Sequence, residues 1–158
     1  MATIISYNVY DKLQVEEKIA KQMFSIISDN MEIILKTDEK SLYKTWYDNC
    51  IDNTKMKTIV LLDKDEVTGY IQYLNENSGV FLSEIQIRNQ NQGDGKTFRE
   101  LMRLFFNKAN IIDSTIIQCK INPQNNKSIN VFKHIGFIKK EKNNYEIRGN
   151  QFKEWMIN

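Results

Sequence analysis

A short loop with two glycines constrains the fold of this 158-residue chain more than any other feature. The loop, Gln90-Asn91-Gln92-Gly93-Asp94-Gly95-Lys96-Thr97, follows a β-rich run that ends near Arg88. After it, apolar residues recur at helical spacing on one face, namely Phe98, Leu101, Met102, Phe105 and Ala109. Main-chain N–H groups and the positive end of the helix dipole meet at such a junction and bind phosphate. The segment therefore predicts a strand, an anion-binding turn and an amphipathic helix.

Two common phosphate-binding motifs do not fit this loop. A P-loop needs a glycine five residues before Gly95, and the chain has Gln90 there. A dinucleotide-binding fingerprint needs a glycine three residues after Gly95, where the chain has Phe98. An ordinary turn between a strand and a helix stays open as an explanation of the loop taken alone.

A second motif follows the loop. Asn126-Lys127-Ser128-Ile129 begins a predicted helix over 127–135, which carries Phe132 and is closed by Gly136-Phe137, with Gly136 in left-handed geometry. Together with Gln90-x-x-Gly93-x-Gly95, this pattern resembles the two acetyl-CoA motifs of the GNAT N-acetyltransferase superfamily. By its order of elements the resemblance covers nearly the whole chain. It implies a GNAT fold, acetyl-CoA as the acetyl donor, and transfer to an amine by direct attack.

The resemblance also implies how acetyl-CoA would be bound. Ile85 and Ile87 would bind the pantetheine arm through their main chain, as an added strand does, and the Ile85 N–H would polarise the thioester carbonyl. Asp94 is discordant in the loop, because a carboxylate repels a pyrophosphate unless it points away. The pyrophosphate would lie on main-chain N–H groups of Gln90, Asn91, Gln92, Gly93, Asp94, Gly95 and Lys96.

Each candidate catalytic or cofactor-contacting residue has more than one possible role. Glu84 is the candidate base, because an amine near pKa 10 must lose a proton before it attacks, and a partly solvated surface carboxylate of the strand is the alternative. Asn126 would contact the arm or cap the following helix. Phe132 would contact the cofactor where relatives often have a tyrosine that protonates the leaving thiolate. Phenylalanine cannot donate that proton, so Tyr145, His134 or water would have to do so.

The rest of the pattern predicts the remaining elements. Helical spacing predicts helices from Val15 to Ile27 and from Leu42 to Cys50, with Asp38 as N-cap of the second. We therefore expect an α+β fold, in a single domain over 1–158, with a mixed and mostly antiparallel sheet of six or seven strands and about four helices. A terminal strand from Phe152 onward would be available to a homodimer. The candidate runs for these strands are 3–10, 58–62, 67–74, 80–88, 115–121, 137–140, 145–148 and 152–157.

Charge and cysteine content narrow the function further. The net charge of +2 shows no large basic field for nucleic acid. Residues 1–80 hold 9 Lys and 13 Asp or Glu (−4), whereas residues 81–158 hold 13 Lys or Arg and 7 Asp or Glu (+6), so an anionic ligand should prefer the second half. Cys50 and Cys119 make neither a disulfide framework nor a metal site. We expect no metal, no membrane span and a cytoplasmic location.

The acceptor is not identified by the sequence beyond a primary amine of a small molecule or a protein. The acidic first half favours a cationic amine. Tyr43, Trp46 and Tyr47 recur at helical spacing, where they either pack in the core or line the acceptor cleft. Two other functions stay open. One is a CoA-binding or acyl-CoA-binding module with little or no transferase activity, which Phe132 suggests, and the other is a nucleotide-binding or interaction domain.

Overall fold

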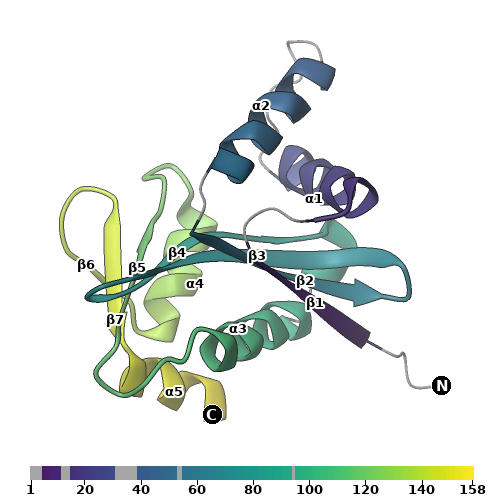
Figure 1. Cartoon of the computed structure of the whole chain (residues 1–158). Coiled ribbons are helices and arrows are strands. Elements are labelled where there is room, and N and C mark those ends of the chain that lie inside the picture. The colour runs from purple at the N-terminus through teal and green to yellow at the C-terminus, as the bar shows by residue number, and fades with distance from the viewer. Residues whose placement is uncertain (1–4, 12–14, 31–38, 53–54, 94) are drawn as a thin grey trace. The chain divides into compact units, whose positions relative to one another are not determined.

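The computed structural model describes residues 5–11, 15–30, 39–52, 55–93 and 95–158 (Figure 1). These residues form a mixed seven-stranded sheet, in the order β1-β2-β3-β4-β5-β7-β6, and five α-helices. The strands are β1 (Ile5–Asp11), β2 (Met56–Asp63), β3 (Glu66–Glu76), β4 (Gly79–Ile87), β5 (Ile116–Lys120), β6 (Ile138–Lys139) and β7 (Asn144–Arg148). The helices are α1 (Glu17–Asn30), α2 (Glu39–Asp52), α3 (Lys96–Lys108), α4 (Asn126–Ile135), α5 (Gly149–Ile157) and the short 3-10 helix η1 (Asn89–Asn91). No helix within these ranges is long and apolar enough to cross a membrane.

The chain divides into two compact units. The first unit comprises Met1–Gln72 and Glu84–Leu101, and the second unit comprises Tyr73–Ser83 and Met102–Asn158. The strands β3 and β4 and the helix α3 therefore each contribute residues to both units.

The core of the first unit forms where α1 covers β2 and β3. Ile19, Met23 and Ile26 recur along one face of α1 and are buried, because this spacing places them on the same side of the helix. Trp46 and Tyr47 of α2 pack against this cluster, which supports core packing for these two aromatic residues. Figure 1 shows α1 and α2 lying next to one another. The cluster comprises Val15, Ile19, Ala20, Met23, Ile26, Val60, Leu62, Val67 and Tyr70.

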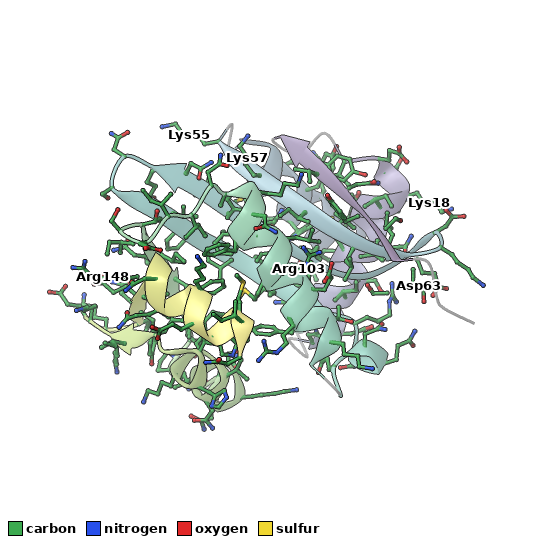
Figure 2. All side chains as sticks on the ribbon, turned by 90° about the horizontal axis from the view of Figure 1, so that it is seen from below. Lys18, Lys55, Lys57, Asp63, Arg103 and Arg148 are labelled. Carbon is green, nitrogen blue, oxygen red and sulfur yellow. The ribbon has the colours of Figure 1, made fainter. Side chains whose placement is uncertain are left out.

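The core of the second unit is rich in aromatic rings. Phe152 of α5 is fully buried, and its ring lies 6.1 Å from that of Phe105 and 5.9 Å from that of Phe106, both on α3. Phe137, which follows α4, completes the cluster at 6.5 Å from Phe152. The outer face of α3 is polar, and Arg103 extends from it (Figure 2). The predicted amphipathic helix after the loop is thus confirmed.

The prediction of a closing strand over 152–157 is wrong, because these residues form most of α5. Trp155 and Met156 lie three and four residues after Phe152, which places the three side chains on one helix face. Gly149 begins the helix against the carbonyl oxygen of Ile112, where a side chain would overlap that oxygen. A terminal strand shared between two copies is therefore not available in this segment.

The other predicted elements are present with shifted ends. β1 pairs antiparallel with β2, and β5 pairs parallel with β4 and antiparallel with β7. Gly136 ends α4 at a φ of 123°, a positive value that favours glycine, as the sequence predicts. Asp38, the predicted cap of α2, lies outside the described residues.

Candidate functional site

The loop between β4 and α3 is held by its own main chain. Three amides donate within it: Asn91 to the Arg88 oxygen at 2.8 Å, Gln92 to the Asn89 oxygen at 3.2 Å, and Gly95 to the Gln92 oxygen at 3.3 Å. The first main-chain bond of α3 is donated by Arg99 to the Gly95 oxygen at 3.0 Å. These bonds engage the amides of Asn91, Gln92 and Gly95, and the N-terminus of α3, where the helix dipole favours negative charge, directly follows the loop.

The two glycines of the loop are present for different reasons. Gly95 has a φ of +73°, a left-handed conformation that favours glycine. Gly93 is exposed, and a Cβ added to it would meet no atom within 4 Å. The packing of the fold therefore does not require glycine at position 93. Close approach of a ligand to the main chain would require it. Asp94, a predicted contact, lies outside the described residues.

A glycine on β3 lets α3 begin close to the strands. A Cβ on Gly69 would lie 3.0 Å from the Gln86 oxygen of β4 and 3.0 Å from Cδ1 of Leu101 on α3. Contacts this short are tighter than nine in ten real Cβ contacts, so glycine lets the strand and the helix approach this closely without displacing either atom. This packing fixes the start of α3, and with it the loop, against β3 and β4.

The main chain of β4 presents an acceptor on the side away from β3. Arg88 N–H donates to the Thr68 oxygen of β3 at 2.9 Å. In a trans peptide the carbonyl of the preceding residue points the opposite way, so the Ile87 carbonyl faces away from β3. Its neighbour in that direction would be β5, but the register of β4 with β5 covers only Gly79 to Leu82 in the described part of the chain. The main chain at Ile85 and Ile87 therefore faces away from β3 at this end of β4.

Two side-chain amides already occupy the Ile87 carbonyl. Asn30 Nδ2, from the last residue of α1, donates to it at 2.8 Å, and Gln92 Nε2 donates to it at 2.8 Å. The role of Asn30 cannot be read from the sequence, because 57 positions separate it from Ile87 and no motif surrounds it. Gln92 is a predicted loop contact, and the structure gives its side chain this additional role.

Glu84 is half-buried on β4, two residues before Gln86. Burial raises the pKa of its carboxyl, and a hydrogen bond from Gln86 Nε2 to Glu84 Oε1 acts in the opposite direction. A carboxyl with a raised pKa is better matched to taking up a proton near neutral pH than an ordinary surface glutamate. The first unit thus brings Glu84, Ile85, Ile87 and the described loop residues together around one strand end.

The other predicted residues belong to the second unit. Asn126 is the first residue of α4 and is exposed, and the cap of this helix is Asn125, whose side chain accepts from Ser128 N–H at 3.1 Å. The interpretation of Asn126 as the cap is therefore wrong. Phe132 is 6% exposed and its ring lies 5.1 Å from that of Phe137, and Tyr145 on β7 is 3% exposed.

The remaining candidate side chains differ widely in exposure. His134 is exposed on α4. Cys119 is buried on β5, and burial raises the pKa of its thiol to about 12. Tyr43 is half-buried on α2, where burial and then the nearby Glu17 carboxylate raise its pKa. Among the described residues, no three His, Cys, Asp or Glu side chains are grouped so that they could hold a metal ion.

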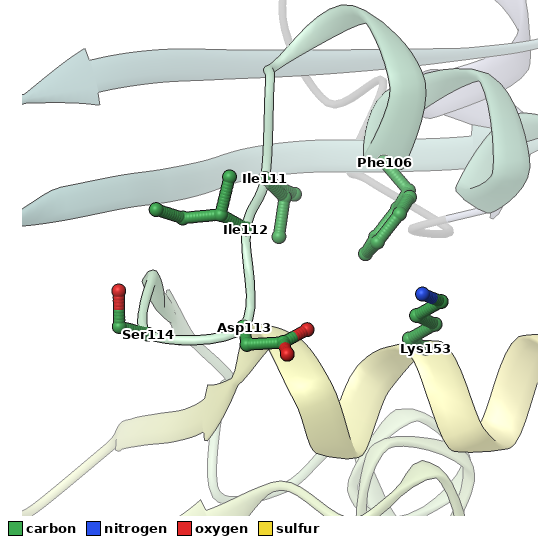
Figure 3. A pocket seen from close by; sticks show the side chains of 6 residues that line it. All are labelled: Phe106, Ile111, Ile112, Asp113, Ser114 and Lys153. Carbon is green, nitrogen blue, oxygen red and sulfur yellow. The ribbon is translucent and has the colours of Figure 1, made fainter.

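A separate hollow lies in the second unit, with a volume of about 460 Å³. Figure 3 shows Phe106 of α3 and Lys153 of α5 pointing toward one another within it. None of the predicted site residues lines it, so it is not the acetyl-CoA site that the sequence predicts. Its lining residues are Phe106, Ile111, Ile112, Asp113, Ser114 and Lys153.

Comparison with solved structures identifies the fold. A GNAT-family acetyltransferase from Desulfovibrio desulfuricans matches with a TM-score of 0.71 and 11% identity, covering 92% of this chain and 99% of that one. An acetyltransferase from Thermus thermophilus matches with a TM-score of 0.68 and 16% identity, covering 93% and 99%. Mutant forms of a spermidine/spermine N-acetyltransferase from Vibrio cholerae match with a TM-score of 0.65 and 14% identity, covering 95% and 96%. No protein-family model and no curated protein matches the sequence significantly. The chain therefore has the GNAT acetyltransferase fold.

Proposed function

We propose that this protein is an N-acetyltransferase that moves an acetyl group from acetyl-CoA to a primary amine. The observation that carries the proposal is the loop between β4 and α3. It combines an exposed glycine that packing does not require with the first turn of a helix, beside a strand edge that faces away from β3. The GNAT fold supports the same activity.

The proposed reaction is a direct attack of the amine on the thioester. A C–N bond forms, the C–S bond breaks, and the proton lost by the amine must be taken up by a base. Glu84 is our candidate for that base, supported by its half-buried position and its raised pKa. The Ile85 N–H is proposed to stabilise the negative charge that develops on the thioester oxygen.

The departing thiolate needs a proton, and Phe132 cannot supply one. Tyr145 has a hydroxyl, but at 3% exposure it would need either a direct approach of the sulfur or a bridging water. General acid catalysis typically contributes about 10²–10⁴-fold, so a transferase without it would be slow but active. Asn126 and Phe132 remain predicted cofactor contacts on the strength of the motif resemblance.

A CoA-binding or acyl-CoA-binding module with little transferase activity is the second candidate. Phe132 favours it, because this ring is buried against Phe137 and offers no proton. The raised pKa of Glu84 favours the enzyme, since such a carboxyl is more typical of a reactive site than of a binding surface.

For the acceptor we propose a cationic amine, because residues 1–80 hold 13 acidic residues against 9 lysines.

Calorimetric titration with acetyl-CoA, CoA and ATP tests the cofactor site, and release of free CoA in the presence of a panel of amines tests turnover. We expect saturable acetyl-CoA binding, weaker ATP binding, and acetylation of at least one amine. In Glu84→Gln the rate should fall by about 10²–10⁴-fold with acetyl-CoA affinity unchanged. Tight acetyl-CoA binding without turnover on any amine would establish the binding module. Absence of binding, checked by thermal shift because the heat can be near zero, would disprove both candidates.

A further inference from the structure

Four polar side chains from three elements of the first unit form one continuous chain of hydrogen bonds. Gln92 Nε2 of the loop donates to Asn30 Oδ1 at 3.1 Å, and Asn30 Nδ2 of α1 donates to Gln86 Oε1 at 2.9 Å. Gln86 Nε2 then donates to Glu84 Oε1. We call Gln92, Asn30 and Gln86 the amide chain. It runs from the glycine loop to the candidate base.

The direction of the amide chain is fixed at both ends by groups that only accept. The Ile87 carbonyl accepts from Asn30 Nδ2 and Gln92 Nε2, so both amides must turn their NH₂ groups toward it. Asn30 Nδ2 has two hydrogens, and the second one goes to Gln86 Oε1. Gln86 is thereby left with its NH₂ group facing Glu84, whose ionised carboxylate is again only an acceptor.

We propose that Asn30 is a positioning residue for Glu84: it holds the Gln86 amide in the one orientation that donates to the Glu84 carboxylate, and Gln92 ties this arrangement to the glycine loop. The inference rests on the proposed function for the role of Glu84 as the base, but the hydrogen-bond arrangement exists without it.

Among the described residues, Gln86 is the polar partner that the Glu84 carboxylate contacts. On the same strand, the Arg88 guanidinium is engaged elsewhere, donating to the Val67 oxygen at 2.8 Å and to Gln22 Oε1 at 3.4 Å. On α1, Asp29 next to Asn30 is exposed. On β3, residues 67–74 include no charged side chain. Within the described part of the chain, burial raises the pKa of Glu84 and the hydrogen bond from Gln86 lowers it.

Two variants break the amide chain at different points. Gln86→Met keeps the length of the side chain and removes the donor to Glu84, and Asn30→Ala removes the group that orients Gln86. Asp29→Ala, one residue away on α1, is the matched control. Losing a hydrogen bond to the carboxylate raises its pKa, so the acidic limb of the pH profile of kcat/KM should move to higher pH. We expect a shift of about one pH unit in Gln86→Met, a smaller one in Asn30→Ala, and none in Asp29→Ala.

A ¹³C NMR titration of the Glu84 carboxyl, assigned by its loss in Glu84→Gln, gives a second readout that needs no activity. An upward shift of the Glu84 titration in both variants, with Asp29→Ala unchanged, supports the inference. An active wild-type enzyme whose acidic limb and Glu84 titration do not move in either variant overturns it. If the wild-type protein transfers no acetyl group, the proposed function fails and the NMR comparison alone decides the inference. A melting curve on each variant shows that it is folded, and Gln86→Met keeps the test valid should Asn30→Ala unfold.

Discussion

At the scale of single residues, a substitution of Gly93 should change acetyl-CoA affinity without changing the stability of the fold. A methyl group at this position would meet no atom within 4 Å, so Gly93→Ala should leave the melting temperature unchanged. If a pyrophosphate approaches this main chain, the same methyl group should weaken acetyl-CoA binding about tenfold or more, a loss of about 1.4 kcal/mol. Calorimetric titration and thermal melting of the variant measure the two effects.

Gly95→Ala is the control for this comparison. Its φ of +73° disfavours any side chain, so the substitution should cost about 1–2 kcal/mol of stability. Gly93→Ala with a lower melting temperature, or with undiminished acetyl-CoA affinity, would contradict a contact between this glycine and the cofactor.

Glu84 should lower the stability of the folded protein at neutral pH. Its pKa is raised in the folded state by burial, so the protonated carboxyl is favoured there, and stability falls as the pH rises through the folded pKa. Glutamine stays neutral. Glu84→Gln should therefore raise the melting temperature at pH 7, and this gain should disappear near pH 4, below the ordinary glutamate pKa of about 4.3.

Differential scanning calorimetry at the two pH values measures this gain, with about 2–4 °C for each kcal/mol at this chain length. Glu154→Gln, at an exposed position of α5, is the control. A gain of equal size at both pH values would show that the Glu84 effect does not come from its ionisation.

At the scale of elements, the start of α4 offers a pair of adjacent asparagines with different roles. Asn125 caps the helix through its bond from Ser128 N–H, so Asn125→Ala should cost about 0.5–2 kcal/mol. Asn126→Ala should leave stability nearly unchanged, because Asn126 is exposed and does not cap. Denaturant unfolding of the two variants measures this difference.

Acetyl-CoA titration adds a second contrast between the same two variants. If Asn126 touches the cofactor arm, its substitution should lower affinity, whereas Asn125→Ala should bind normally once folded. Equal affinities in both would remove Asn126 from the proposed site.

The elements differ in how well the sequence predicts them. β4, the loop and α3 are predicted well, because the change from β-rich residues to helical spacing is long and is marked by glycines. α5 is mistaken for a strand, since the run 152–157 is too short for periodicity alone to distinguish a strand from a helix. Only tertiary packing decides between them, here the burial of Phe152 among the rings of Phe105 and Phe106.

At the scale of the whole molecule, acetyl-CoA should stabilise the folded chain by mass action. At a concentration 100 times its Kd the gain is about 2.7 kcal/mol, which corresponds to roughly 5–11 °C in melting temperature for this length. ATP at the same concentration and ionic strength is the control, because it carries similar charge but lacks the pantetheine arm. An equal shift with ATP would indicate general phosphate binding and would contradict an acetyl-CoA site.

The candidate site is only partly predictable from the sequence, because some of its contacts join residues that are far apart in the chain. The loop and the residues of β4 follow one another in sequence, so a motif can reveal them. Asn30 reaches Gln86 across 56 positions and Ile87 across 57, through a contact that exists only when α1 is folded against β4. Neither its residue type nor its neighbours in sequence distinguish it from the other asparagines of the chain.

The burial of Cys119 makes site-specific fluorescent labelling at an introduced cysteine practical. Cys119 is 4% exposed and its thiol has a pKa raised to about 12, so the thiol is almost entirely protonated at pH 7–8 and reacts slowly with maleimides and iodoacetamides. In a Cys50→Ser background, a cysteine introduced at exposed Gln90 would therefore be the fast-reacting position. A fluorophore attached there would report the arrival of a ligand at the glycine loop in real time, without a coupled assay and before any acceptor is known.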